Sequence, residues 1–133
     1  MRGLHLTADL RGCAADRPVM TNLDALRSAC LGAITGAGLT PVGELFHRFV
    51  PTEGATSTAP AGITGVVLLA ESHLAVHTWP EIEAATLDVY VCNIGADNSA
   101  RADLLLGALV AAFQPVVVER RSLERGVILS TPS

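Results

Sequence analysis

The chain has 133 residues, of which 50% are hydrophobic and 17% charged, and it carries a net charge of −4 at pH 7. This composition is typical of a folded globular protein, and the length predicts a single domain over residues 1–133. The nine basic residues are scattered arginines that form no basic stripe, which argues against nucleic acid and in favour of a small molecule as the partner.

The first half of the chain predicts two strands and a helix. Residues 4–10 alternate apolar and polar side chains, the pattern of a half-buried strand, and a loop follows. Thr21 or Asn22 can cap a helix that ends at Gly36. A second strand is predicted over residues 39–50, with an irregularity near its start.

The second half predicts a loop, four strands and a helix. Residues 52–61 are rich in Ser and Thr and poor in apolar bulk, so we expect a surface loop that could act as a lid. The expected strands cover residues 63–70, 74–79, 84–92 and 116–123, and the expected helix covers residues 100–113. This order predicts an α+β fold: a mainly antiparallel sheet covered on one face by two helices, in a two-layer sandwich.

Three cysteines, Cys13, Cys30 and Cys92, lack the CxxC spacing of a structural zinc site and do not form a disulfide framework. The longest apolar stretch, residues 104–113, is about half the length that spans a bilayer, and the N-terminus lacks a signal-peptide pattern. We therefore expect a cytoplasmic protein with reduced thiols and no membrane partner. The sequence also has no lysine, so pyridoxal phosphate cannot be attached in its usual way.

Reactive side chains are concentrated in residues 71–81, ESHLAVHTWPE, and Asp88 and Cys92 follow on the next expected strand. A purely structural interpretation is open: Ser72 belongs to a turn, Trp79 fills the core, and the charges face water.

Two catalytic interpretations have specific weaknesses. His73 and His77 have the spacing of helical zinc ligands, with Cys92 as a third ligand, but on a strand they lie about 13 Å apart. A serine hydrolase built on Ser72 lacks the GxSxG elbow, and no pattern recommends an acid.

A third interpretation comes from a family resemblance. The segments GVVLLA, ESHLAVHTWPE and LDVYVC, together spanning residues 65–92, resemble the bacterial and archaeal S-adenosylmethionine decarboxylase proenzymes. Residues 3–13 resemble the opening strand of that family, residues 45–49 its second strand, and residues 125–126 its end. The resemblance covers nearly the whole chain, and the ESHxxxHTWPE run with a cysteine twenty residues after the serine is far more specific than a catalytic dyad.

The resemblance implies that the chain cuts itself. In that family a serine hydroxyl attacks the carbonyl that precedes it, so Ser72 would attack the carbonyl of Glu71 and convert the amide into an ester. Loss of the Ser72 α-proton would release the upstream chain, and hydrolysis would leave a pyruvoyl group. The products would be residues 1–71 and 72–133, and the pyruvoyl group would be the covalent cofactor, without pyridoxal phosphate or a metal.

The resemblance also assigns roles to particular residues. His77 corresponds to the base of the elimination, and Thr64 occupies the place of the family's processing serine. Cys92 corresponds to the proton donor that acts after carbon dioxide leaves. Glu81 corresponds to the acceptor for the ribose hydroxyls, and Phe49 to the ring that stacks on adenine.

Strand alternation adds an expectation about the backbone. Positions 72 and 77 are an odd number of residues apart, so on one straight strand their side chains would face opposite sides. We therefore expect the chain to turn near Ser72 or His73.

The chain departs from the family pattern near the expected substrate pocket. Pro51 and Gly62 are separated by a longer link than usual, and Ile82, Glu83 and Asn93 stand where aromatic or glycine residues are usual. The substrate is therefore less firmly indicated than the self-cleavage.

Three functions remain open from the sequence. The first is an S-adenosylmethionine decarboxylase that supplies aminopropyl groups for spermidine. The second is a pyruvoyl-dependent ornithine or arginine decarboxylase, in which Glu81 or Glu83 binds a cationic side chain. The third is an unprocessed, non-catalytic homologue that acts as a binding or regulatory subunit. By analogy with relatives of this length, we expect a homodimer of processed chain pairs with the site near the interface.

Overall fold

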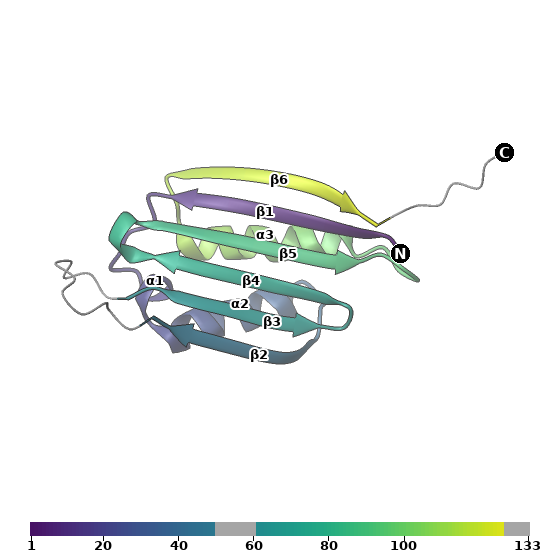
Figure 1. Cartoon of the computed structure of the whole chain (residues 1–133), viewed down its shortest axis with the longest axis horizontal. Coiled ribbons are helices and arrows are strands. Elements are labelled where there is room, and N and C mark those ends of the chain that lie inside the picture. Colours follow the sequence, from purple (N-terminus) through teal and green to yellow (C-terminus); the bar gives the residue numbers. More distant parts are fainter. Residues whose placement is uncertain (50–60, 127–133) are drawn as a thin grey trace.

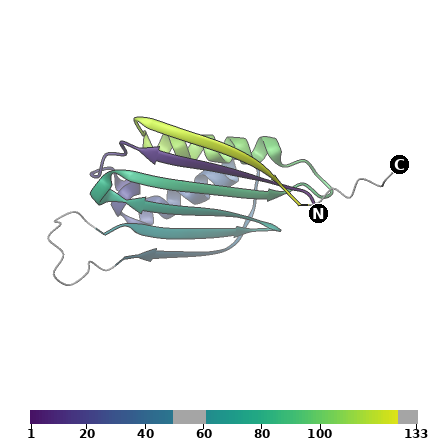
Figure 2. The same cartoon turned by 45° about the horizontal axis from the view of Figure 1, so that its top comes forward.

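The computed structural model describes residues 1–49 and 61–126, which form a six-stranded sheet with the helices on one of its faces (Figures 1 and 2). The strand order is β2-β3-β4-β5-β1-β6, and each neighbouring pair is antiparallel. The predicted α+β sandwich is therefore confirmed. The elements in chain order are β1 (Gly3–Arg11), α1 (Pro18–Thr21), α2 (Leu23–Gly36), β2 (Pro41–Arg48), β3 (Ile63–Leu69), β4 (Ser72–Trp79), the 3-10 helix η1 (Pro80–Ile82), β5 (Ala84–Cys92), α3 (Ser99–Phe113) and β6 (Val117–Arg125).

The structure differs from the sequence-based expectations in its short elements. The short helix α1 lies where a loop was expected, and its Met20 is buried. The expected irregularity near the start of β2 is confirmed as a register shift between Pro41 and Gly43. Most of the predicted loop over residues 52–61, and Val50 at the end of the predicted second strand, lie outside the described residues.

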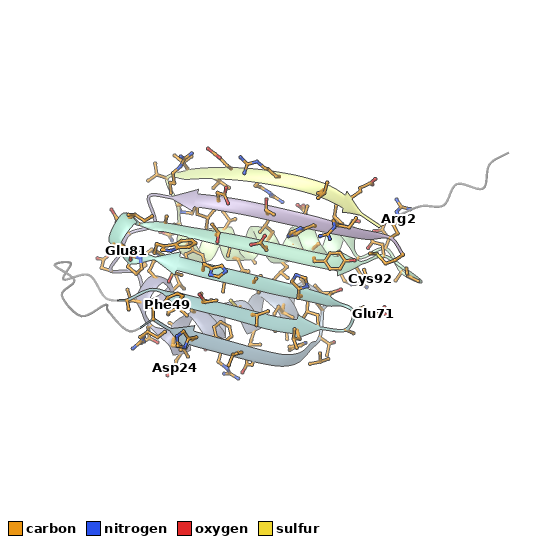
Figure 3. All side chains as sticks on the ribbon, viewed as in Figure 1. Arg2, Asp24, Phe49, Glu71, Glu81 and Cys92 are labelled. Atoms are coloured by element: carbon orange, nitrogen blue, oxygen red, sulfur yellow. The ribbon has the colours of Figure 1, made fainter. Side chains whose placement is uncertain are left out.

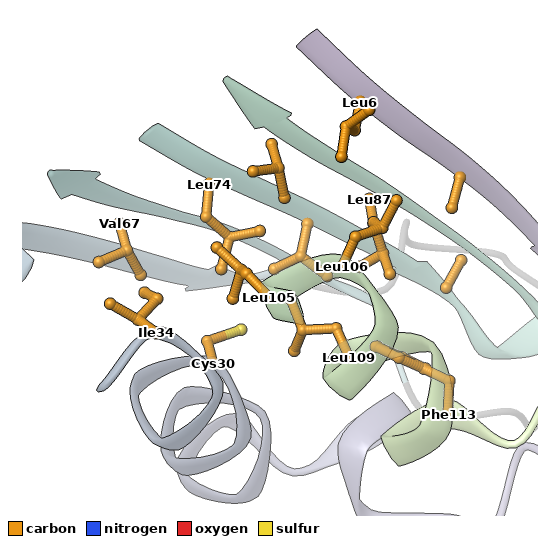
Figure 4. Close-up of a cluster of buried hydrophobic side chains, with 14 of the residues drawn as sticks. Leu6, Cys30, Ile34, Val67, Leu74, Leu87, Leu105, Leu106, Leu109 and Phe113 are labelled. Atoms are coloured by element: carbon orange, nitrogen blue, oxygen red, sulfur yellow. The ribbon is translucent and has the colours of Figure 1, made fainter. Parts of the chain in front are cut away.

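The core lies between the sheet and the two long helices (Figure 4). Leu26, Cys30 and Ile34 line the inner face of α2, and α3 contributes Leu105 and Leu109. Alternate side chains of the strands fill the other half of the core, and each fully buried leucine stabilises the fold by about 1.5–3 kcal/mol. The strand residues of this core include Leu6, Val67, Leu74, Leu87 and Val89.

The opposite side of the sheet, which we call the open face, carries no helix among the described residues (Figures 1 and 2). The strand register and alternation place all four histidines of the chain on this face: His5, His47, His73 and His77. Large apolar side chains are exposed among them, with Leu45 70%, Leu68 51% and Leu123 59% exposed. The open face therefore combines titratable groups with apolar surface.

The two halves of the chain are interleaved in the sheet. Strands β1, β2 and β3 precede position 72, and β4, β5 and β6 begin at or after it. Because β1 is hydrogen-bonded to both β5 and β6, and β3 to β4, two pieces divided before residue 72 would stay paired along three strand edges.

The end of β6 lies beside the start of β1. Gly3 pairs with Arg125, and Gly126 has a φ of 90°. A Cβ at Gly126 would lie 2.1 Å from the carbonyl oxygen of Met1, so only glycine fits there.

Thr78 is a buried polar residue that connects three elements. Its hydroxyl donates to the carbonyl oxygen of Met20 over 2.9 Å and accepts from the N–H of Ile63 over 2.9 Å. Both partners belong to backbone that would otherwise be unpaired in a dry environment, so this hydroxyl fixes α1 against β3 and β4.

We expect Thr78→Val to lower the free energy of unfolding by about 1–3 kcal/mol, because it leaves a buried donor and a buried acceptor without partners. Thr78→Ser keeps the hydroxyl and should cost less. Denaturant titration of both variants in an uncut background would measure the difference, and equal stabilities would contradict the assigned role.

No helix among the described residues has the length and apolar character that crossing a bilayer requires.

Candidate active site

The peptide between Glu71 and Ser72 lies at the end of a tight hairpin. Leu69 of β3 pairs with Ser72 of β4, so only Ala70 and Glu71 make the turn. Glu71 has a φ of 55°, in the left-handed region that two-residue hairpins usually fill with glycine or asparagine. A residue with a β-carbon pays about 1–2 kcal/mol in that conformation, so the backbone just before Ser72 is strained.

The hydroxyl of Ser72 is held against the end of β5. Its Oγ accepts a hydrogen bond from the backbone N–H of Cys92 over 3.1 Å. The Cys92 side chain is almost covered, with 8% of its surface exposed. The structure therefore brings together Glu71, Ser72 and Cys92, three of the residues predicted from the sequence, and we call this group the nucleophile end.

A second group lies at the other end of the sheet. Thr64 Oγ1 and His77 Nδ1 are 3.0 Å apart on paired strands, and the His77 ring stacks on Trp79 with centroids 5.7 Å apart. Phe49 meets His47 edge-on at 5.5 Å, and Glu81 is exposed on η1. We call Thr64, His77, Phe49 and Glu81 the histidine end.

The two ends are far apart within one chain. Ser72 and His77 are five residues apart on β4, or about 16 Å, and Ser72 has the alternation of the buried Leu74 whereas His77 faces the open side. Figure 3 shows Glu71 and Cys92 at one end of the sheet and Phe49 and Glu81 at the other. The alternation argument from the sequence is thus confirmed.

The expected turn near Ser72 or His73 is wrong. The chain turns at Ala70 and Glu71, and β4 runs without a break from Ser72 to Trp79 because its residues pair continuously with β5 or β3. No local bend reunites the serine with His77.

The middle of the open face holds two side-chain contacts that the sequence did not predict. His5 Nε2 lies 3.2 Å from Asp88 Oδ1, and the ring of His73 lies 5.5 Å from that of Tyr90. Strand alternation could have placed each residue on a face, but the pairing of β1 with β5 joins positions 83 residues apart and has no local signal.

Glu83, Cys13 and Cys30, which the sequence analysis also singled out, have roles within the fold. The Glu83 carboxylate accepts the N–H of Ala15 over 3.1 Å, which occupies it within the fold. Within residues 1–49 and 61–126, no three His, Cys, Asp or Glu side chains are grouped to hold a metal ion. Burial and then Glu83 raise the pKa of Cys13, and burial and then Glu44 raise the pKa of Cys30 to about 12, so both are unreactive core thiols.

Fold and turn together define a two-layer α+β protein that presents a serine directly after a strained peptide. The family described as S-adenosylmethionine decarboxylase matches residues 4–126. The S-adenosylmethionine decarboxylase proenzyme of Aquifex aeolicus is 35% identical over 126 residues, covering 95% of this chain and 82% of the relative. That of Persephonella marina is 34% identical over 126 residues, covering 95% and 84%. The chain belongs to the S-adenosylmethionine decarboxylase family.

Solved structures agree with this assignment. The crystal structure of the Aquifex aeolicus adenosylmethionine decarboxylase matches with a TM-score of 0.81 and 33% identity, covering 98% of this chain and 96% of that one. A Trypanosoma brucei AdoMetDC monomer matches with a TM-score of 0.55 at 11% identity, covering 88% of this chain and 44% of that one, and this likeness concerns the fold alone.

We expect Glu71→Gly to stabilise the uncut chain by about 1 kcal/mol relative to Glu71→Ala, because glycine adopts the left-handed conformation without a steric penalty. Both substitutions remove the carboxylate, so their difference isolates the backbone. Denaturant unfolding of the two variants, each combined with Ser72→Ala to prevent cleavage, measures it. Equal free energies would show that the turn stores no strain.

Proposed function

We propose that this chain is a self-processing S-adenosylmethionine decarboxylase that depends on a pyruvoyl group made from Ser72 and supplies aminopropyl groups for spermidine in the cytoplasm. One observation carries the proposal: the Ser72 hydroxyl is fixed beside a strained peptide in a chain of this decarboxylase family. The free thiols Cys13, Cys30 and Cys92 are compatible with a reducing compartment.

The residues present fit a cofactor made from the chain itself. Ser72 is the first residue of β4, so cleavage before it would leave a new N-terminus still held by the β4 pairings. The chain contains no lysine to carry pyridoxal phosphate. The pyruvoyl carbonyl would supply the electron acceptor that decarboxylation of an amino acid requires.

Each end of the sheet would contribute a different part of the processing chemistry. At the nucleophile end, the N–H of Cys92 orients the Ser72 hydroxyl as it attacks the Glu71 carbonyl. At the histidine end, a bond from His77 Nδ1–H to Thr64 Oγ1 leaves the lone pair on Nε2 to take the Ser72 α-proton.

These two parts need a second copy of the chain to meet. In a twofold dimer whose open faces pack together about an axis perpendicular to the strands, the histidine end of one subunit would lie over the nucleophile end of its partner. Ser72 is the first residue of β4, so its α-carbon lies at the end of the sheet, although its side chain has the alternation of the buried Leu74. Packed sheets are about 10 Å apart, a gap that side chains bridge. The exposed Leu45, Leu68 and Leu123 supply apolar surface for such an interface.

The same arrangement divides the substrate contacts. Glu81 and Phe49, proposed for the ribose and the adenine, would come from the subunit that provides His77. Cys92, proposed as the proton donor, would come from the subunit that carries the modified Ser72.

Mass spectrometry and carbon dioxide release together test the function. We expect the purified wild-type protein to consist of residues 1–71 and 72–133, and Ser72→Ala to remain one uncut chain because it lacks the nucleophile. The cut protein should release carbon dioxide from S-adenosylmethionine in preference to ornithine or arginine. A wild-type chain that stays whole on long incubation would contradict the proposal and favour a non-catalytic homologue. Faster release of carbon dioxide from ornithine or arginine would show that the substrate is not S-adenosylmethionine.

Complementation tests the shared site. Ser72→Ala and His77→Ala chains should each stay uncut alone, because one lacks the nucleophile and the other the base. When the two are co-expressed, a mixed dimer holds one site with Ser72 from one chain and His77 from the other. We expect cleavage of the His77→Ala chain only, identified by the mass of its residues 72–133. Absence of any cleavage in purified mixed dimers would contradict a site shared between subunits.

A further inference from the structure

Cys92 is held by hydrogen bonds on both of its peptide groups at the point where β5 ends. Its N–H donates to Ser72 Oγ over 3.1 Å, and its carbonyl oxygen accepts from Asn98 Nδ2 over 2.8 Å. The second bond comes from a residue beyond the sheet, so it has no part in the strand pairing.

Asn98 does not use its side chain in the way its position predicts. Asparagine before the first turn of a helix ordinarily accepts an N–H of that turn, as Asn22 does for α2 by accepting from Ala25 over 2.9 Å. Asn98 occupies this position at α3 and makes no such bond. Asp97 accepts the N–H of Ser99 instead, over 2.9 Å, and this bond lowers the pKa of Asp97. Helix capping therefore does not explain the orientation of the Asn98 side-chain amide.

Neighbouring groups fix the orientation of that amide. Arg101 donates to Asn98 Oδ1 over 2.8 Å, which leaves Nδ2 directed at Cys92. The Asn98 N–H donates to Asn93 Oδ1 over 2.8 Å. The N–H of Asn93 is itself bonded to the carbonyl oxygen of Arg2 over 2.9 Å. Asn93 stands where the family resemblance leads to an expectation of glycine, so this connection is a departure from that pattern.

Processing would make the bond from Asn98 to the Cys92 carbonyl more important. When the Ser72 hydroxyl oxygen has attacked the Glu71 carbonyl and the ester has been eliminated, that oxygen leaves with Glu71 as part of its new carboxylate. The N–H of Cys92 would then lose Ser72 Oγ as its acceptor, whereas the reaction changes neither the Asn98 amide nor the Cys92 carbonyl that it contacts.

We propose that Asn98, oriented by Asn93 and Arg101, is a positioning residue that holds Cys92 in place to deliver its proton in the mature enzyme. The inference rests on the proposed function, because it assumes that Cys92 is the proton donor. Asn98 itself touches neither Ser72 nor the substrate in this scheme and acts through the backbone of Cys92.

Asn98→Asp is the sharpest variant. It keeps the size of the side chain and the preference for a helix start, but it replaces the donor to Cys92 by a carboxylate oxygen that repels the Cys92 carbonyl. Asn22→Ala is the control, because it removes an asparagine that caps α2 and has no bond to Cys92. Asn22→Ala should be cut like the wild type. Asn98→Asp should also be cut to completion, because before cleavage the bond between the Cys92 N–H and Ser72 Oγ still holds the end of β5.

In the cut protein, we expect Asn98→Asp to lower kcat about fivefold with KM unchanged, the size of effect that the loss of one neutral hydrogen bond gives. A second measurement is the fraction of residue 72 recovered as alanine after turnover. Alanine arises when the proton goes to residue 72 instead of the substrate; the substrate nitrogen then stays on residue 72, and the substrate leaves as an aldehyde. This fraction should rise with Asn98→Asp and not with Asn22→Ala, and an unchanged fraction and kcat would overturn the proposal.

A third measurement requires no catalytic turnover. It uses chains that carry Ser72→Ala, because this substitution removes the hydroxyl that processing also removes from residue 72. We expect Asn98→Asp to raise the rate of Cys92 alkylation by iodoacetamide about fivefold, because the loosened strand end uncovers the thiol. Cys13 and Cys30 are fully buried and should react little. An unchanged rate would overturn the positioning role. A wild-type chain that is never cut would instead contradict the proposed function, and the alkylation rate would still decide the role of Asn98.

Discussion

The continuous antiparallel register of β4 between β3 and β5 determines where Ser72, His77, Thr64 and Cys92 lie. Because β4 pairs without interruption from Ser72 onwards, alternation alone sends Ser72 and His77 to opposite faces. The same register sets Thr64 beside His77 and brings the end of β5, with Cys92, to Ser72. The separation of the site into two ends is therefore a property of the sheet, and no side-chain rotation could remove it.

The register also maintains the strained turn. The pairing of Leu69 with Ser72 leaves two residues to reverse the chain, and Glu71 must take a left-handed conformation that its β-carbon disfavours. Strain of about 1–2 kcal/mol is small beside the burial of several leucines in the same sheet, each of which contributes about as much or more. The fold can thus hold an unfavourable backbone at the position where the chemistry is proposed, and cleavage there would relieve it.

The sequence predicted the parts of this structure that repeat with a regular period. The two-residue alternation over residues 4–10 and 84–92 identified β1 and β5, and apolar spacing identified α2 and α3. The helix α1 was missed because four residues carry no period, and the turn at Ala70 and Glu71 because neither residue is a usual turn former.

The candidate site was predicted in its residues but not in its arrangement. Resemblance supplied Ser72, His77 and Cys92, and alternation gave warning that the first two would not meet. The distance between Ser72 and His77 follows from β4 alone. Which residues join them, Thr64 beside His77 and Cys92 beside Ser72, depends on which strands pair, a long-range property that local patterns do not encode. The contact of Asn98 with Cys92 was likewise hidden, because the local expectation for an asparagine at that position is a helix cap.

The closeness of Met1 and Gly126 has a consequence for how the chain could be connected. Met1 and Gly126 adjoin, and the peptide between Glu71 and Ser72 lies in the hairpin that joins β3 to β4. A circular permutant that joins Gly126 to Met1 and opens before Ser72 would therefore keep all five strand pairings. Such a molecule would begin with an ordinary serine and have the topology of a cut chain without having undergone the reaction. It would separate what the broken bond does for the architecture from what the converted residue does for the chemistry.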